Sequence, residues 1–326
     1  MRRGALILTA TIAATLLAGG PAHAGTYQVI ACSDEGFGPV GPHTFNVNNS
    51  WTQNPATPPA GLEAFVFCPR QGSLQHNGIV AEDQIPGPPD TPAGSDLFWR
   101  FRAPAGSTIT HLDIDRFLGK VGEQDWRPYG RADGAIFDTC DIASGQNDCQ
   151  NTGTASFAVN NASTIDYGVR CDASSVCGVG VSDHRVWVSV YSAAVTVNDP
   201  SSPTMSGPSG PLWAGGYQQG RESSASFGGS DNTGISEAAW LVDGRQYTSD
   251  RNGCDYSRPL PCPDMSADTV HNVDDRARIG IEQRLVLGGD RTLCDGRFDC
   301  VEHRYTCIDA RASPCPNDRS SLACAL

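Results

Sequence analysis

The stretch SDLFWRFRAPAGSTITHLDIDRFL, residues 95–118, decides the fold class. Every second residue from Leu97 to Phe101 is a large apolar side chain, which is the period of a half-buried strand. The Pro- and Gly-containing segment 103–107 has turn chemistry, and residues 108–117 resume a β-rich pattern. The stretch therefore predicts two strands, joined as a hairpin, in the core of a β domain.

The chain up to residue 199 continues this pattern. Short apolar alternations recur between turn-forming segments, and the longest is residues 185–198, RVWVSVYSAAVTVN. No segment before residue 200 places apolar side chains at helical spacing over three turns. We therefore expect an all-β fold, with a β-sandwich or jelly roll over residues 25–199. Residues 79–94 and 125–130 are expected to be irregular surface loops.

The N-terminus has the features of a secretory signal peptide. A basic start, Met1-Arg2-Arg3, precedes an apolar run from Ala5 to Ala18 and an Ala-His-Ala cleavage site at residues 22–24. The run is too short to span a bilayer, which takes about 20 residues. We expect residues 1–24 to be removed and the mature protein to be secreted, with no membrane insertion. The net charge of −13 disfavours a nucleic-acid partner, because acidic chains repel phosphate backbones.

Thirteen cysteines in an exported chain predict disulfides. The candidates are Cys32, Cys68, Cys140, Cys149, Cys171, Cys177, Cys254 and Cys262. Among the first six, Cys140/Cys149 and Cys171/Cys177 would each close a short loop, which leaves the first two cysteines for each other. Six cysteines allow 15 pairings, so this pairing is a preference among alternatives. Metal binding is the other interpretation, but the spacing of metal-binding cysteines is missing.

A second, smaller β domain is predicted after a Pro/Ser/Gly-rich linker at residues 200–212. Within this module, residues 213–263, the loop SDNTGI (230–235) followed by LVDG (241–244) resembles bacterial immunoglobulin-like domains. The whole layout resembles exported actinobacterial proteins that pair a lectin-like (concanavalin A-like) sandwich with such a module. Beyond the module the β pattern stops, and we expect a Cys-rich tail, residues 264–326, that is disordered or frameshifted.

A loop with aromatic and arginine side chains is the predicted ligand-binding site. The sequence contains no nucleophile elbow, zinc-protease, phosphate-loop or dinucleotide motif. The binding candidates are Trp126, Arg127, Tyr129 and Arg131. Aromatic faces stack on sugar rings, and arginines donate hydrogen bonds to hydroxyl groups. The alternative is that Trp126 is tucked onto the edge of the sandwich. A platform formed by Trp187 and Tyr191 is a second possibility for binding.

A metal site is a further candidate. His111, Asp113 and Asp115 stand two residues apart, so on a strand their side chains share one face. Such a set suits Ca²⁺ or Mn²⁺, whereas the alternative is a solvated strand face. The two aspartates are also the candidate carboxylate pair of a glycoside hydrolase, although the glutamates of such a motif are missing. Residues 231–232 with Asp243 are either a Ca²⁺ site or a plain turn.

These features together predict an extracellular binding protein for carbohydrate, with polysaccharide or cell-envelope glycan as partner and Ca²⁺ as the one candidate cofactor. This hypothesis rests on analogy at the level of the fold. Two alternatives stay open. The protein is an extracellular polysaccharide hydrolase that uses Asp113 and Asp115, or it is a structural or adhesion protein without a small ligand. The missing catalytic motifs favour a protein that is not an enzyme.

Overall fold

The computed structural model describes residues 25–33, 47–68, 77–86, 90–122, 125–140, 148–181, 183–210, 223–242, 245–266, 271–273 and 281–286. The chain divides into two units, Met1–Asp290 and Arg291–Leu326, and all described residues belong to the first. The predicted signal peptide and every residue after 286 lie outside the described ranges.

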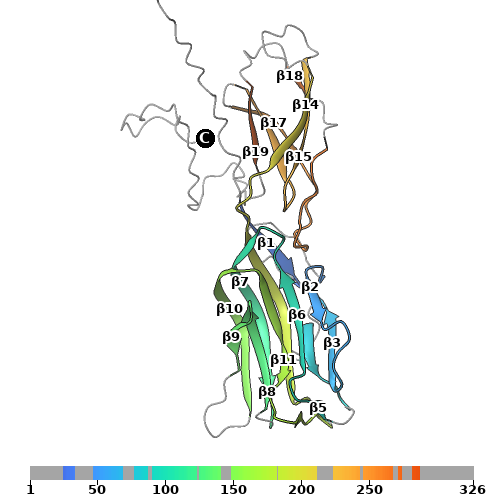
Figure 1. Cartoon of the computed structure of the whole chain (residues 1–326). Helices are drawn as coiled ribbons and strands as arrows, with labels where there is room; N and C mark the ends of the chain where they lie inside the picture. The colour runs from blue at the N-terminus through green and yellow to red at the C-terminus, as the bar shows by residue number, and fades with distance from the viewer. Residues whose placement is uncertain are drawn as a thin grey trace, which may run out of the picture. The chain divides into compact units, whose positions relative to one another are not determined.

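The described residues form strands and contain no helix, so the all-β prediction is confirmed. Within these ranges no helix is present that is long and apolar enough to cross a membrane. The first group of strands makes a sandwich of two antiparallel sheets (Figure 1). One sheet has the order β10-β7-β13-β4-β3, and β1 also pairs with β13. Its strands are β1 (Thr26–Ala31), β3 (Leu62–Phe67), β4 (Gly78–Asp83), β7 (Thr108–Lys120), β10 (Cys149–Ala162) and β13 (Val186–Asn198).

The second sheet of the sandwich has the order β2-β6-β11-β8-β9. Its strands are β2 (Trp51–Asn54), β6 (Asp96–Arg102), β8 (Trp126–Ala132), β9 (Ala135–Thr139) and β11 (Thr164–Cys171). A short pair, β5 (Thr91–Pro92) and β12 (Val176–Cys177), lies outside both sheets. The core fills the space between the two sheets, and strands of both sheets contribute its buried side chains.

The segment that decides the fold joins the two sheets and is not a hairpin. β6 pairs with β2 and β11, whereas β7 pairs with β10 and β13. The predicted hairpin is therefore wrong, although both strands and the turn between them are present. The turn carries the chain from one sheet to the other, and Gly106 adopts a φ of 86° in it. Apolar alternation indicates which face of a strand is buried, but it does not indicate which strand is its partner.

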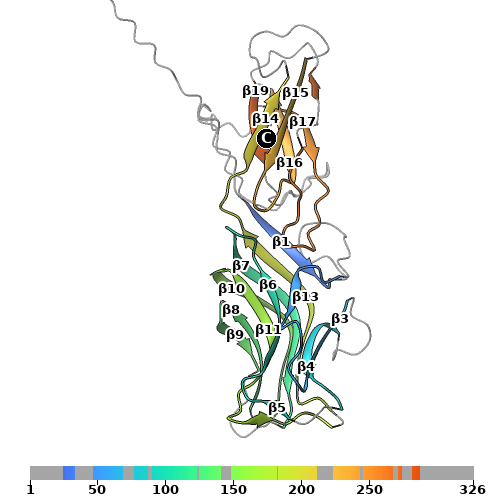
Figure 2. The ribbon, with the colours of Figure 1, turned by 45° about the vertical axis from the view of Figure 1, so that its right-hand side comes forward.

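The segment predicted as an irregular excursion, residues 79–94, contains a central strand. β4 is buried along its whole length, between β13 and β3 (Figure 2). A strand buried on both faces shows no alternation, and the acidic end of this one suggested a surface loop. The Asp83 carboxylate is buried at the end of this strand. Three backbone N–H groups, those of Gly180, Arg185 and Val186, donate to it at 2.8–3.0 Å and offset the free-energy cost of its burial.

Four disulfides are present, and the first three confirm the predicted pairing. They join Cys32 to Cys68, Cys140 to Cys149, Cys171 to Cys177, and Cys254 to Cys262. The first three stabilise the sandwich, and the fourth closes a loop after β17 in the next group of strands. Such bonds persist in an oxidising environment, so the disulfides fit an extracellular protein.

The second group of strands extends beyond the predicted limits of the smaller module. It contains the sheets β14-β15-β18 and β17-β16-β19. The strands are β14 (Thr204–Ser209), β15 (Ser223–Ser230), β16 (Glu237–Val242), β17 (Arg245–Arg251), β18 (His271–Val273) and β19 (Ile281–Val286). β14 lies within the predicted linker, and β18 and β19 lie within the predicted tail. The linker therefore holds a strand, and the β structure does not stop at residue 263.

Candidate functional site

The predicted binding loop is a strand, so its residues alternate between two faces. β8 places Arg127, Tyr129 and Arg131 on the outer face of the five-stranded sheet, as their register with the outward residues of β11 requires. Trp126 points the other way, is 1% exposed and donates from its indole Nε1 to the Gly178 carbonyl at 2.8 Å. The expected surface loop is therefore wrong, whereas the alternative that Trp126 packs onto the sandwich is confirmed, since its ring belongs to the core.

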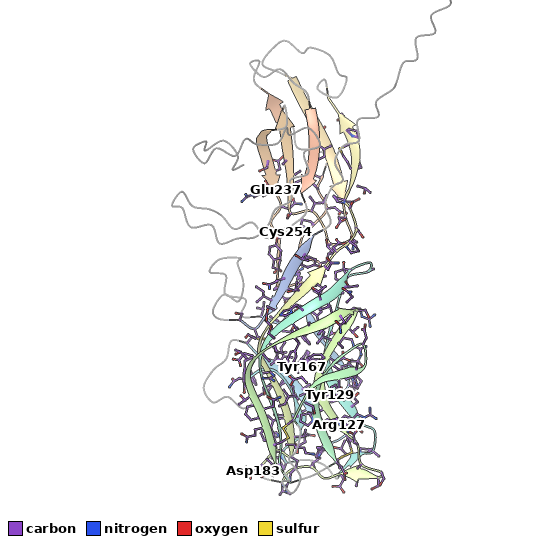
Figure 3. The ribbon with its side chains drawn as sticks, turned by 90° about the vertical axis from the view of Figure 1, so that its left-hand side faces the viewer. Arg127, Tyr129, Tyr167, Asp183, Glu237 and Cys254 are labelled. Carbon is purple, nitrogen blue, oxygen red and sulfur yellow. A yellow bond between two sulfur atoms is a disulfide. The ribbon has the colours of Figure 1, made fainter. Side chains whose placement is uncertain are left out.

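The neighbouring strands β6 and β11 add further charged residues to the same outer face. Strand register places Arg100, Asp166 and Arg131 in one row across the sheet, and Asp96, Arg170 and Arg127 in another. We call this surface the arginine face. Its members are Asp96, Phe98, Arg100, Arg102, Arg127, Tyr129, Arg131, Asp166 and Arg170 of the strands, with Asp172 just after β11. Figure 3 labels Arg127 and Tyr129, which mark its position on β8.

A network of hydrogen bonds fixes the row formed by Arg100, Asp166 and Arg131 on the arginine face. Arg100 donates to both carboxylate oxygens of Asp166, from Nε at 2.7 Å and from Nη2 at 2.8 Å. Arg131 donates from Nε to Asp166 at 2.7 Å and from Nη1 to Asp96 at 2.9 Å. Asp166 is 1% exposed, so its charge is tolerated only because two guanidinium groups bind it. Both arginines keep their charge: the hydrogen bond to Asp166 raises the pKa of Arg100, and for Arg131 the aspartates outweigh the lowering effect of burial.

Two aromatic rings lie beneath these guanidinium groups. Phe98 and Tyr129 flank Gly168 in the row between the two charged rows. The Arg131 guanidinium carbon lies 4.5 Å from the Phe98 ring centre and 4.8 Å from that of Tyr129. The Tyr129 hydroxyl donates to Asp96, and burial, followed by the nearby Asp96 charge, raises the pKa of the phenol well above its usual value. The rings therefore support the arginines and do not present their own faces to solvent.

The other charged row, formed by Asp96, Arg170 and Arg127, ends in two exposed arginines that share one aspartate. Arg127 and Arg170 are directly opposite each other on β8 and β11. Their Nε atoms lie 2.8 Å and 3.0 Å from the two different carboxylate oxygens of Asp172. The side chains of Arg127 and Arg170 are 51% and 49% exposed, so both guanidinium groups are accessible to a ligand. We call the two arginines, together with the Asp172 that they share, the arginine doublet.

The predicted metal set does not come together as a metal site. His111 Nε2 lies 3.2 Å from Asp113 Oδ1 and 2.7 Å from Ser156 Oγ, and the Ser156 hydroxyl donates to Asp113. Asp115 lies further along the strand, and the described residues contain no group of three or more His, Cys, Asp or Glu residues that could hold a metal ion. The Ser-His-Asp arrangement is not a catalytic triad, because the aspartate contacts the same ring nitrogen as the serine.

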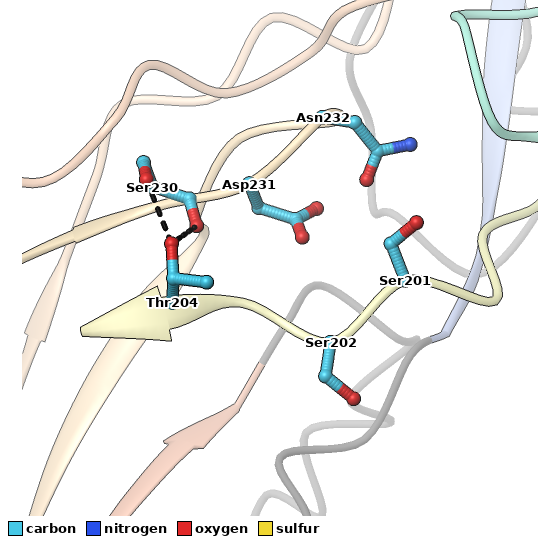
Figure 4. Close-up of a pocket in the computed structure, with 6 residues that line it drawn as sticks. All are labelled: Ser201, Ser202, Thr204, Ser230, Asp231 and Asn232. Carbon is cyan, nitrogen blue, oxygen red and sulfur yellow. Dashed lines mark hydrogen bonds between the residues drawn. The ribbon is translucent and has the colours of Figure 1, made fainter.

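The segment around Asp231 is a turn. Its carboxylate accepts from the Thr233 backbone N–H at 3.1 Å, and Asn232 donates to the carbonyl oxygen of Ala105. Burial, together with the neighbouring Asp199, raises the pKa of Asp231. A pocket of about 320 Å³ lies beside this turn (Figure 4). It is lined by Ser201, Ser202, Thr204, Ser230, Asp231 and Asn232. Asp243, the third predicted residue of this set, lies outside the described residues.

The suggested platform on β13 is buried. Trp187 and Tyr191 are 5% and 3% exposed, and the Trp187 ring stacks on Phe117 with ring centres 5.6 Å apart.

The sequence interpretation missed Asp166, Arg170 and the part that Arg100 plays in the site. Alternation within β8, had residues 126–132 been taken as a strand, would have placed Arg127, Tyr129 and Arg131 together and separated them from Trp126.

Comparison with known proteins adds little to this picture. No family model and no curated protein matches the chain. A solved structure of a family GH115 4-O-methyl-α-glucuronidase, BtGH115A, with specificity for decorated arabinogalactans, is similar over 47% of this chain and 18% of that chain. The sequence identity is 14% and the TM-score is 0.21. The chain thus spans less than a fifth of that enzyme. The strand order itself defines the class of this chain, an all-β sandwich protein.

Proposed function

We propose that this protein is secreted and binds carbohydrate through the arginine face. Three of the four ligand-binding residues predicted from the sequence, Arg127, Tyr129 and Arg131, lie on that face. Secretion is supported by the signal-peptide features of residues 1–24 and by the four disulfides.

The observation that carries the proposal is the arginine doublet. Arg127 and Arg170 are half exposed, yet Asp172 holds both guanidinium groups in place through their Nε atoms. Hydrogen-bond donors that are ordered before binding cost less entropy when a ligand engages them. Guanidinium groups donate up to five hydrogen bonds each, and hydroxyl-rich sugars supply the matching acceptors. The face is also the outer side of an antiparallel sheet, so a polymer can lie across several strands.

A glycan array tests the proposal with the full mature chain. We expect the wild type to bind at least one class of glycan, and the double variant Arg127→Ala/Arg170→Ala to lose at least about tenfold in affinity, since charge-assisted hydrogen bonds are among the stronger ones. Arg258→Ala is the matched control, because Arg258 is also exposed and pairs with a single aspartate, Asp255, at 2.9 Å. The control is expected to bind like the wild type.

Two results would overturn the proposal. The first is that the intact protein binds no glycan, which would favour a structural or adhesion role. The second is that the double variant binds as well as the wild type. Trp126→Ala is not a suitable binding variant, because truncating a buried tryptophan destabilises the sandwich itself.

A further inference from the structure

We infer that the ligand of the arginine face is an acidic polysaccharide, one whose sugar rings carry carboxylate groups. This inference rests on the proposed function and specifies its substrate class. It follows from three features of the face: the occupied aromatic rings, the local excess of positive charge, and the geometry of the arginine doublet.

The aromatic rings of the face are not free to stack on a neutral sugar. Recognition of neutral sugars by stacking needs an exposed ring face. Here Tyr129 is 1% exposed, and the guanidinium groups of Arg131 and Arg100 lie over Phe98 at 4.5 Å and 4.9 Å. A ligand that approaches this surface meets guanidinium groups first. The face therefore favours a ligand that binds guanidinium, and an anion does this more strongly than a hydroxyl group.

The charge of the face is opposite to that of the whole chain. The face carries five arginines and three aspartates, Asp96, Asp166 and Asp172, so its net charge is +2. The chain as a whole has a net charge of −13. Asp125 precedes β8 and is not a member of the face. Its charge acts on the buried Lys120 amine, where it opposes the lowering of the Lys120 pKa by burial. Positive charge gathered on one face of an acidic chain attracts an acidic polymer to that face.

The arginine doublet already binds a carboxylate in the way we propose for the ligand. The two guanidinium groups, on adjacent strands, each direct Nε at a different oxygen of the planar Asp172 carboxylate. One aspartate neutralises one of the two arginines, so the doublet keeps a net charge of +1. The remaining N–H groups of two half-exposed guanidinium groups suit a second planar carboxylate supplied by a uronic acid residue.

Isothermal titration of the full mature chain with three polymers tests the inference. The probes are polygalacturonate, the same polymer after reduction of its carboxyl groups, and dextran sulfate. We expect polygalacturonate to bind and the carboxyl-reduced polymer to bind at least about tenfold more weakly, because it lacks the charged acceptor. Arg127→Gln/Arg170→Gln is expected to lose polygalacturonate binding to the same degree, while Arg258→Gln retains it. Binding is expected to weaken as salt rises.

Five outcomes would overturn the inference, and the last two separate its failure from that of the proposed function. Equal binding of the reduced polymer would remove the role of the carboxylate. Equal or tighter binding of dextran sulfate would indicate a general anion surface, and unchanged binding by the double variant would remove the arginine doublet. If the protein binds neutral glycans through Arg127 and Arg170 but not polygalacturonate, this inference fails while the proposed function stands. If no glycan binds at all, both fail.

Discussion

The clearest test of the fold is the buried ion pair that links the two sheets of the sandwich. Arg116 of β7 points into the space between the sheets and meets Asp138 of β9, with Nε–Oδ2 at 2.9 Å and Nη2–Oδ1 at 3.2 Å. The side chains are 6% and 3% exposed. The Tyr167 hydroxyl and the Asn151 amide also donate to the Asp138 carboxylate, at 2.9 Å and 3.1 Å. Asp138 therefore accepts hydrogen bonds from three side chains at once, and two of them, Arg116 and Tyr167, are buried.

Asp138→Ala should destabilise the sandwich by about 3–5 kcal/mol, since it leaves a buried guanidinium without its counter-charge. Asp138 also keeps Arg116 charged, because its hydrogen bond and charge outweigh the lowering of the pKa by burial. Asp172→Ala is the matched control. It breaks ion pairs with two half-exposed arginines and should cost at most about 1 kcal/mol. Urea unfolding at pH 7, followed by tryptophan fluorescence with the disulfides intact, measures both variants.

A double variant separates the cost of a stranded charge from the worth of the pair. Arg116→Met/Asp138→Leu replaces both charged groups with apolar ones, and it should be more stable than Asp138→Ala by about 1–3 kcal/mol, although the Tyr167 hydroxyl loses its acceptor. Two results would refute this reasoning. One is a loss below about 1 kcal/mol for Asp138→Ala, which would mean that Arg116 relaxes to water. The other is a double variant as unstable as the single one.

Two further changes probe the turn and the strand that shape the arginine face. Gly168→Ala should destabilise the sandwich by about 1–3 kcal/mol in the same urea assay, because the added Cβ would collide with the Leu97 carbonyl oxygen and the Phe98 Cβ. A neutral effect would show that β6 and β11 can separate there. Asp133 accepts from the backbone and hydroxyl groups of Ser163 and Thr164, and these hydrogen bonds lower its pKa despite the opposing effect of burial. Its contribution to stability is therefore present above the pKa of the unfolded state and is lost as pH falls through the lower folded value. Thermal melts of Asp133→Ala from pH 7 to pH 2 should show a smaller loss on acidification than the wild type, and parallel curves would contradict this.

Local chemistry in the sequence was enough to predict the elements of the sandwich, but not their partners. The alternation at Leu97, Trp99 and Phe101 indicates a buried face, and all three residues lie in the core. Whether β6 pairs with β7 depends on contacts with strands far away in the chain, and no residue near the turn encodes them. The disulfides were predictable because short loops close at little entropic cost, so Cys140 and Cys171 each pair with the next cysteine.

The candidate site could also be predicted only in part from the sequence. The residue types were predictable: Arg127, Tyr129 and Arg131 stood out as an aromatic and basic cluster. Their geometry was not, because Pro128 and Gly130 suggested a loop where β11 and β9 hold a strand. Asp166 and Arg170 join the site only through β11, far along the chain from β8. A residue that completes a site from a neighbouring strand leaves no local signal in the sequence.

The charge arrangement of the arginine face is not explained by stability alone. Half-exposed ion pairs such as those of the arginine doublet contribute little to folding, about 0–1 kcal/mol each. The buried Asp166 costs desolvation that two arginines offset, and an apolar pair would serve the sheet as well. The surrounding sheet needs only ordinary polar side chains on its outer face. A network that adds little stability but fixes guanidinium groups beside solvent is what recognition of an anion requires. The variants Asp172→Ala and Arg127→Gln/Arg170→Gln should therefore change binding far more than they change unfolding.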